Sequence, residues 1–201
     1  AEAARMLREQ GRAGETLFSY LPAPAFMSAG EQLFDDILRD NEITGAAASR
    51  LREINRQLRG LVENQLTGGQ GEFIQILQLG EMEHRADTCF ISTSLSLLGK
   101  RKVVVSPAHY ARGLRELALR LEAFPAADAD DIRLPAMNCW CRGTSWMVQM
   151  DCEGFRLCRE PTLCGAAYTT LEQGWRRVPP GRKDPAAVRA VLERLIERLE
   201  K

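Results

Sequence analysis

The sequence lacks a net charge, because its 27 acidic residues balance 27 basic ones over 201 positions. The long-range positive field that draws basic proteins onto nucleic acids or anionic membranes is therefore missing. The sequence also lacks an uninterrupted apolar run of about 18 residues, the length that a membrane-spanning helix needs. With 45% apolar residues, the composition predicts a globular protein with no membrane partner, and any anion binding must come from a local patch.

Histidine is scarce, and this restricts the enzyme classes open to the chain. Only His84 and His109 are available as imidazole bases. A thiol nucleophile needs such a base within hydrogen-bonding distance, so Cys89 with either histidine, oriented by Asp87, is the sole candidate. Cys89 lies on the apolar side of an alternating segment, which is typical of a core thiol, and no serine-hydrolase, zinc-protease or nucleotide-binding fingerprint is present. We expect no catalytic residues and no enzymatic activity.

The six cysteines are too few for a disulfide scaffold. The first 21 residues contain no apolar core of a signal peptide, so we expect reduced thiols in an intracellular compartment, cytoplasmic or nuclear. Because the chain opens at Ala1 without a methionine, we also expect an excised segment or a processed product. Five cysteines lie within 26 residues: Cys139, Cys141, Cys152, Cys158 and Cys164.

This cysteine cluster has to be tested against zinc, which binds thiolates that tight turns usually supply as C-x2-C pairs. A two-residue turn at Gly143-Thr144 predicts pairing of Cys139 with Val148 and places Cys152 roughly 13 Å from Cys139 along the sheet. The remaining candidate metal ligands are Cys139, Cys141, Cys158 and Cys164. Zinc ligands, disulfides and buried small side chains are the three open interpretations. We favour buried side chains without a cofactor, because free cysteine is among the most buried residue types.

The first third of the chain has helical patterns. A weak helix is predicted over residues 5–19, and Ser28 with Glu31 has the spacing of a capping box before a second helix. From Thr44, apolar residues recur at spacings of four and three over about 20 residues, which predicts a helix with one apolar seam. The seam consists of Ala47, Leu51, Ile54, Leu58 and Leu61. Residues 1–67 are therefore predicted to form a helical N-terminal region.

Beyond residue 71 the apolar period changes from 3.6 to 2, the period of a strand. One three-stranded antiparallel meander is predicted over residues 73–79, 88–98 and 103–105, and a second over 133–142, 145–151 and 155–159. Ser106-Pro107 predicts the start of a helix between the two meanders, and Asp184-Pro185 the start of a terminal amphipathic helix. Residues 72–201 are thus predicted to be an α+β domain, with antiparallel sheet, packing helices and a C-terminal helix.

The terminal helix has an apolar seam of its own, formed by Val188, Leu192, Leu195 and Leu199. Covering such a seam stabilises a structure by about 25 cal/mol per Å² of apolar surface. The two seams predict a non-catalytic protein-interaction or assembly module, an adaptor or scaffold. Its helices would pair in coiled-coil fashion with a partner protein or with a second copy of the chain.

Two alternatives remain open. A nucleic-acid-binding module is the first, because arginines gather on one flank of the middle helix and a basic stretch follows near residue 175 with an aromatic side chain available for stacking. These candidate anion-binding residues are Arg50, Arg52, Arg56, Arg59, Trp175, Arg176, Arg177, Arg182 and Lys183. A zinc-stabilised domain is the second alternative.

Overall fold

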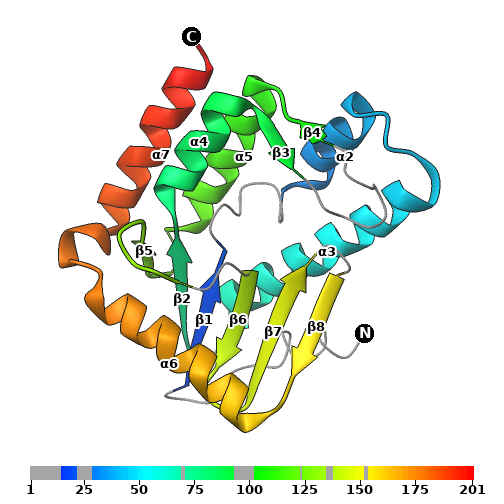
Figure 1. Cartoon of the computed structure of the whole chain (residues 1–201). Helices are drawn as coiled ribbons and strands as arrows, with labels where there is room; N and C mark the ends of the chain where they lie inside the picture. Colours follow the sequence, from blue (N-terminus) through cyan, green and yellow to red (C-terminus); the bar gives the residue numbers. More distant parts are fainter. Residues whose placement is uncertain are drawn as a thin grey trace.

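The computed structural model describes residues 15–21, 29–68, 71–92, 102–122, 124–134, 138–151 and 154–201. Its centre is a six-stranded mixed sheet in the order β5-β2-β1-β6-β7-β8, with helices on both faces (Figure 1). The strands are β1 Thr16–Tyr20, β2 Glu72–Leu77, β5 Ala126–Asp128, β6 Asn138–Arg142, β7 Trp146–Asp151 and β8 Gly154–Cys158. A separate two-stranded sheet pairs β3, Phe90–Ser92, with β4, Lys102–Val104.

The expected α+β class is confirmed, but the expected pair of antiparallel meanders is wrong. Strands β1, β2 and β5 run parallel, and β1 pairs antiparallel with β6. Only β6, β7 and β8 form the predicted meander. The first meander fails because helix α4, Leu79–Thr88, follows β2 at once and carries the chain out of the sheet. Strand β3 consequently pairs with β4 alone, and residues 93–98 of the predicted strand lie outside the described residues.

The predicted helix over residues 5–19 is also corrected. Its first part, residues 5–14, lies outside the described residues, whereas residues 16–20 form β1. Leu17, Phe18 and Tyr20 are all buried, because helices cover both faces of this central strand. A strand buried on both faces has a continuous apolar run instead of strict alternation, so its period does not identify it. Since β1 pairs with β2 and β6, one sheet contains residues from both predicted regions of the chain.

The β6–β7 hairpin differs from the prediction by one residue. Arg142 pairs with Trp146 and Cys139 with Gln149, so the connection has three residues instead of two. Gly143 begins this turn with a φ of +50°, a conformation that glycine adopts without steric cost.

Six α-helices are described: α2 Glu31–Asp40, α3 Gly45–Gly68, α4, α5 Pro107–Arg120, α6 Pro161–Arg177 and α7 Pro185–Leu199. Helices α2, α3, α5 and α7 confirm sequence predictions, whereas α4 and α6 were not predicted. The Ser106 hydroxyl accepts a hydrogen bond from the His109 amide at the start of α5. The Asp184 carboxylate accepts one from the Ala186 amide at the start of α7. Helix α2 has its N-cap at Gly30, and residues 29 and 30 are not helical, so the capping box predicted from Ser28 is wrong and the helix begins two residues later.

The two faces of the sheet contact different parts of the core. Apolar side chains from α2, α3, α4, α5 and α7 pack over one face, where Trp140 and Val148 lie. Helix α6 covers the opposite face, and Cys164 and Leu171 point into that layer. None of the helices described has the length and apolar character needed to cross a membrane.

Candidate functional site

A surface groove of about 430 Å³ lies between α5 and α7. The two helices pack together in antiparallel orientation. Arg115 on α5 forms an ion pair with Glu200 just beyond α7, and Arg189 on α7 pairs with Glu122 just beyond α5 at 3.0 Å. These ion pairs connect the two helices at opposite ends of the groove.

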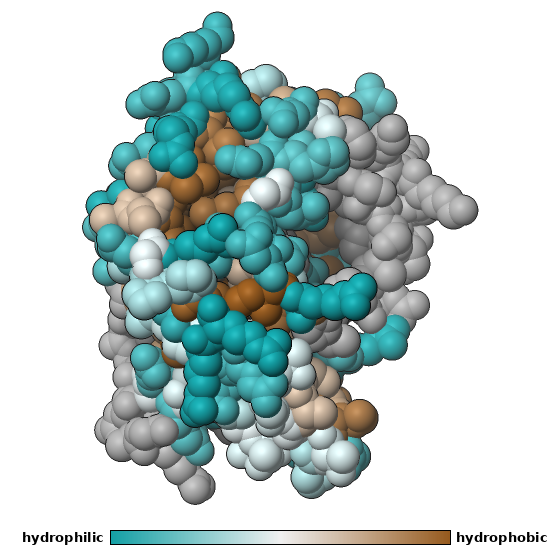
Figure 2. Space-filling model, turned by 60° about the vertical axis from the view of Figure 1, so that its left-hand side comes forward, coloured by the Kyte–Doolittle hydropathy of each residue, from teal (hydrophilic) through white to brown (hydrophobic). Residues whose placement is uncertain are grey.

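The floor of this groove is apolar. Ala118 and Ile196 are about nine-tenths buried, whereas Leu119 is 69% exposed. Seen from the side of the molecule to which α7 belongs, apolar atoms lie open to solvent between hydrophilic side chains (Figure 2). An isolated exposed leucine is common in proteins, but this one lies in a hollow whose floor is also apolar.

Two carboxylates line the α7 side of the groove between the bridging ion pairs. Glu193 and Glu197 are exposed and lie one helical turn apart. Within the described part of the chain, neither takes part in an ion pair. The groove therefore combines an apolar floor with uncompensated negative charge along one rim.

The predicted seam of α7 lies on the other side of this helix. Val188, Leu192 and Leu195 are buried in the core of the chain itself, and the partly buried Leu199 packs against the same core. Helix α7 is therefore held in place by packing against α5, α4 and β5 of the same chain. The surface that α7 leaves open to a partner is the groove rim and not the predicted seam.

The seam of α3 has a similar position. Leu51 is buried, and Ala47 and Ile54 are partly buried against the same core. The side chains of Leu58 and Leu61 lie outside the description. The described members of both seams are thus covered by this chain, and their role in binding a partner stays a prediction.

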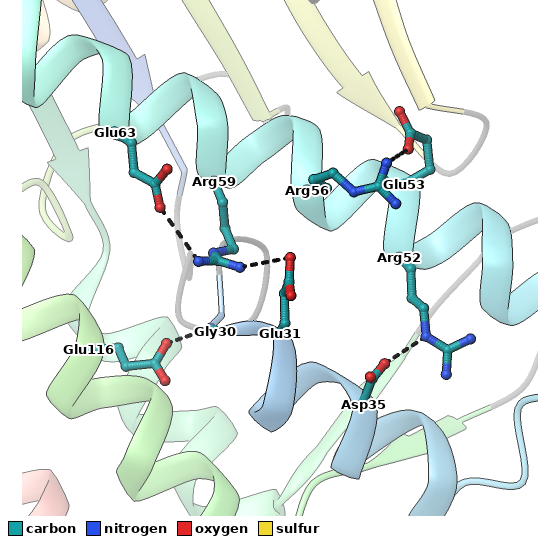
Figure 3. Close-up of polar contacts among 9 residues, drawn as sticks. All are labelled: Gly30, Glu31, Asp35, Arg52, Glu53, Arg56, Arg59, Glu63 and Glu116. Atoms are coloured by element: carbon teal, nitrogen blue, oxygen red, sulfur yellow. Dashed lines mark hydrogen bonds and ion pairs between the residues drawn. The ribbon is translucent and has the colours of Figure 1, made fainter.

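Carboxylates surround the predicted arginine flank of α3. Three of its four arginines make ion pairs with α2 or with α3 itself, as Figure 3 shows. These pairs are Arg52–Asp35 at 2.6 Å, Arg56–Glu53 at 2.5 Å, Arg59–Glu31 at 3.4 Å and Arg59–Glu63 at 3.5 Å. Arg50 is the exposed member for which the described residues show no pair. Much of the positive charge on this flank is neutralised within the protein.

The basic stretch from 175 to 183 is partly neutralised as well. Arg176 pairs with Glu172 at 2.9 Å, and Arg182 with Asp131 at 2.5 Å. The Lys183 ammonium lies 4.7 Å from the centre of the Trp175 ring, where a base would have to stack. Arg177 is exposed and has no ion pair in the described ranges.

The cysteines form a buried thiol layer beneath α6. Cys139, Cys141 and Cys164 are buried, Cys158 is partly exposed, and all four are free thiols. A hydrogen bond with Cys139, together with burial, raises the pKa of Cys141 well above its usual value. Burial and contact with Cys158 raise the pKa of Cys164 to about 11. Both shifts favour the neutral thiol over the thiolate.

The four candidate cysteine ligands lie near one another, but the described residues form neither a metal site nor a thiol-imidazole pair. In the described ranges, no group of three or more His, Cys, Asp or Glu residues is placed to hold a metal ion. Cys89 ends α4 in a left-handed conformation with a φ of 49°, and its thiol donates to the Ala86 carbonyl at 3.3 Å. His109 lies 3.3 Å from Asp40. No hydrogen bond within the described part joins Cys89 to His84 or His109.

The sequence prediction missed the groove residues Leu119, Glu193 and Glu197. One signal was available: Leu119 departs from the apolar stripe of α5, which includes Leu114, Leu117 and Leu121. A large apolar side chain on the polar side of an amphipathic helix indicates a surface that another helix or a partner protein can cover. That signal does not identify the neighbouring helix, which lies about 70 residues further along the chain.

Comparison with known proteins does not add an assignment. No protein-family model matches the chain, and no curated protein and no solved structure matches it.

Proposed function

We propose that this chain is a non-catalytic protein-interaction module that binds a helix of a partner protein in the groove between α5 and α7. The observation that carries the proposal is the exposed Leu119 above an apolar floor of Ala118 and Ile196. An amphipathic helix that lays its apolar face into such a groove is a recurring mode of recognition.

The groove offers enough apolar surface for useful affinity. Fully burying a leucine side chain stabilises a complex by about 1.5–3 kcal/mol. Leu119 is 69% exposed, so about 1–2 kcal/mol remains to be gained by covering it, and this is worth roughly a fivefold to thirtyfold change in Kd. Helices α5 and α7 already pack against each other through the core of the free chain, so little ordering is needed before the partner binds.

The alternative functions have less support. Nucleic-acid binding depends on arginines that release counterions from phosphates, and most candidate arginines here already contact carboxylates. A zinc-stabilised domain needs at least three ligands placed around one ion, and the described residues contain no such group. We therefore retain the interaction module as the proposed function.

Selection from a displayed library of amphipathic helices tests the proposal. The library is panned on the wild-type protein and on L119S, with L163S as the matched control, because Leu163 on α6 is similarly exposed at 57% but lies outside the groove. We expect helices that bind the wild type and L163S and lose at least tenfold in affinity for L119S. If no helix is enriched over an unrelated protein, or if the binders keep their affinity for L119S, the proposal is wrong.

A further inference from the structure

We infer that the partner helix is basic along one flank, with Lys or Arg placed to meet Glu193 and Glu197. This inference rests on the proposed function and adds the charge of the partner to it. It is based on a difference among the charged side chains that line the α5–α7 groove: the basic ones form ion pairs, whereas two of the carboxylates do not among the described residues.

The basic side chains that line the groove are already engaged. Arg115 and Arg189 each bridge to a carboxylate of the opposite helix or its end. The carboxylates of Glu193 and Glu197 have no such partner in the described residues. A ligand that enters between the two ion pairs therefore meets negative charge for which the described residues show no ion pair.

The two carboxylates also repel each other. Like charges at positions i and i+4 of a helix weaken it slightly. A cation from the partner would remove this repulsion and make charge-assisted hydrogen bonds, which are shorter and stronger than neutral ones. An acidic partner would bring further repulsion to the same rim, so the groove discriminates by charge as well as by apolar fit.

The spacing of the lining residues fits a helical partner. On α5 they lie at positions 115, 118, 119 and 122, and on α7 at positions 189, 193, 196 and 197. Each set follows one face of its helix over about two turns, or roughly 10 Å at 1.5 Å per residue. Two turns of a partner helix span this length, with one apolar residue per turn facing the floor.

A second copy of the chain is a poorer occupant. A copy that inserted its own α7 would bring Glu193 and Glu197 toward the same pair on the first molecule. The groove side of α7 carries only Arg189 as a basic residue, and its guanidinium already pairs with Glu122. We therefore assign the groove to a different protein.

Two fluorescein-labelled helical peptides of 15 residues provide the test. They share a leucine ridge at positions i, i+3, i+4 and i+7, and their flanks carry either four lysines or four glutamates. Fluorescence anisotropy measures the Kd of each peptide for the wild type, for E193Q/E197Q and for L119S. The matched control is E42Q/E83Q, which removes two exposed carboxylates that do not line the groove.

We expect the lysine peptide to bind the wild type and E42Q/E83Q at least tenfold more tightly than the glutamate peptide, with the preference reduced below threefold in E193Q/E197Q. Equal binding of both peptides, lost in L119S, would overturn the charge inference and leave the proposed function in place. If neither peptide binds, or if L119S binds as well as the wild type, both proposals fail. A stable dimer in light scattering that L119S dissociates would assign the groove to a second copy and overturn the inference.

Discussion

Replacing Leu192 by alanine tests whether α7 packs on its own chain as described. Leu192 lies in the middle of α7 and is completely buried, with 0% of its surface exposed. It belongs to the same apolar core as Leu114 and Leu117 of α5, so its removal leaves a cavity between elements that pack against each other.

The expected loss of stability is large. Replacing a core leucine with alanine costs about 2–5 kcal/mol, the sum of lost transfer free energy and the cavity left behind. For a chain of this size each kcal/mol lowers Tm by about 2–4 °C, so a loss near 3 kcal/mol lowers Tm by roughly 6–12 °C. L119A removes the same atoms from an adjacent helix, but at 69% exposure it is expected to change the free energy of unfolding by at most about 0.5 kcal/mol.

Urea denaturation followed by circular dichroism measures both variants. We expect L192A to lower the denaturation midpoint at an unchanged m-value, and L119A to leave it close to the wild type. If the apolar seam of α7 were covered by a partner and not by this chain, the two variants of the isolated protein would lose similar, small amounts. A loss below about 1 kcal/mol for L192A would refute the packing described for α7.

Three further predictions concern titration, helix capping and thiol reactivity. Burial raises the pKa of Asp130 from 3.8 to about 6 despite the hydrogen bond from the Gly80 amide. Between about pH 4 and 6 the folded state therefore keeps a proton that the unfolded state has lost. The free energy of unfolding should fall as the pH rises over this range, and it should fall less in D130N. S106A should lower the free energy of unfolding by about 1 kcal/mol in urea, because it removes the N-cap of α5, while S106D should retain it. Cys164 should react with N-ethylmaleimide more slowly than the partly exposed Cys89, as mass spectrometry of digests would measure, because burial raises its pKa to about 11.

Each of these predictions has a contradicting result. An equal loss of stability between pH 4 and 6 in the wild type and D130N would remove Asp130 as its source. If S106A matched the wild type in urea, the hydroxyl would not contribute to the start of α5. Equal labelling rates for Cys164 and Cys89 in the native protein would contradict the buried thiol layer.

Local signals predicted most of the helices. The cap residues Ser106 and Asp184 act within the first turns of their own helices, so their effect is visible in a few neighbouring residues. The apolar stripe of α7 likewise follows from the period of 3.6 residues, and the structure confirms that this face is buried.

Helix α6 was not predicted, because it contains two interior glycines that disfavour a helix and that only tertiary contacts explain. Gly165 and Gly174 lie inside it, and glycine normally disfavours a helix interior. At Gly174 a Cβ atom would lie 2.8 Å from the Leu134 side chain, so the close approach of a neighbouring segment favours glycine there. Such a reason is visible only when both segments are in place.

For a similar reason, local sequence patterns could not predict the order and direction of the strands in the sheet. Residues 16–20 pair with strands from much later in the chain, and pairing at such separation leaves no periodic trace in β1 itself. The alternating residues near Thr88 predicted a strand that would continue the sheet, but α4 intervenes between β2 and β3. Order and direction in a sheet depend on which surfaces remain to be covered after the helices have packed.

By itself, the sequence determined where α3, α5 and α7 begin and that three strands near the thiols form a meander. Capping, period and turns act over a few residues, so these features are visible locally. Only the tertiary structure decided that the α7 stripe meets its own core and that the thiols lie buried beneath α6. It also decided that Leu119 stays exposed beside Glu193 and Glu197, for which the part of the chain described here shows no ion pair. Each of these outcomes depends on segments far apart in the chain, whose contacts are chosen by the packing of the whole molecule.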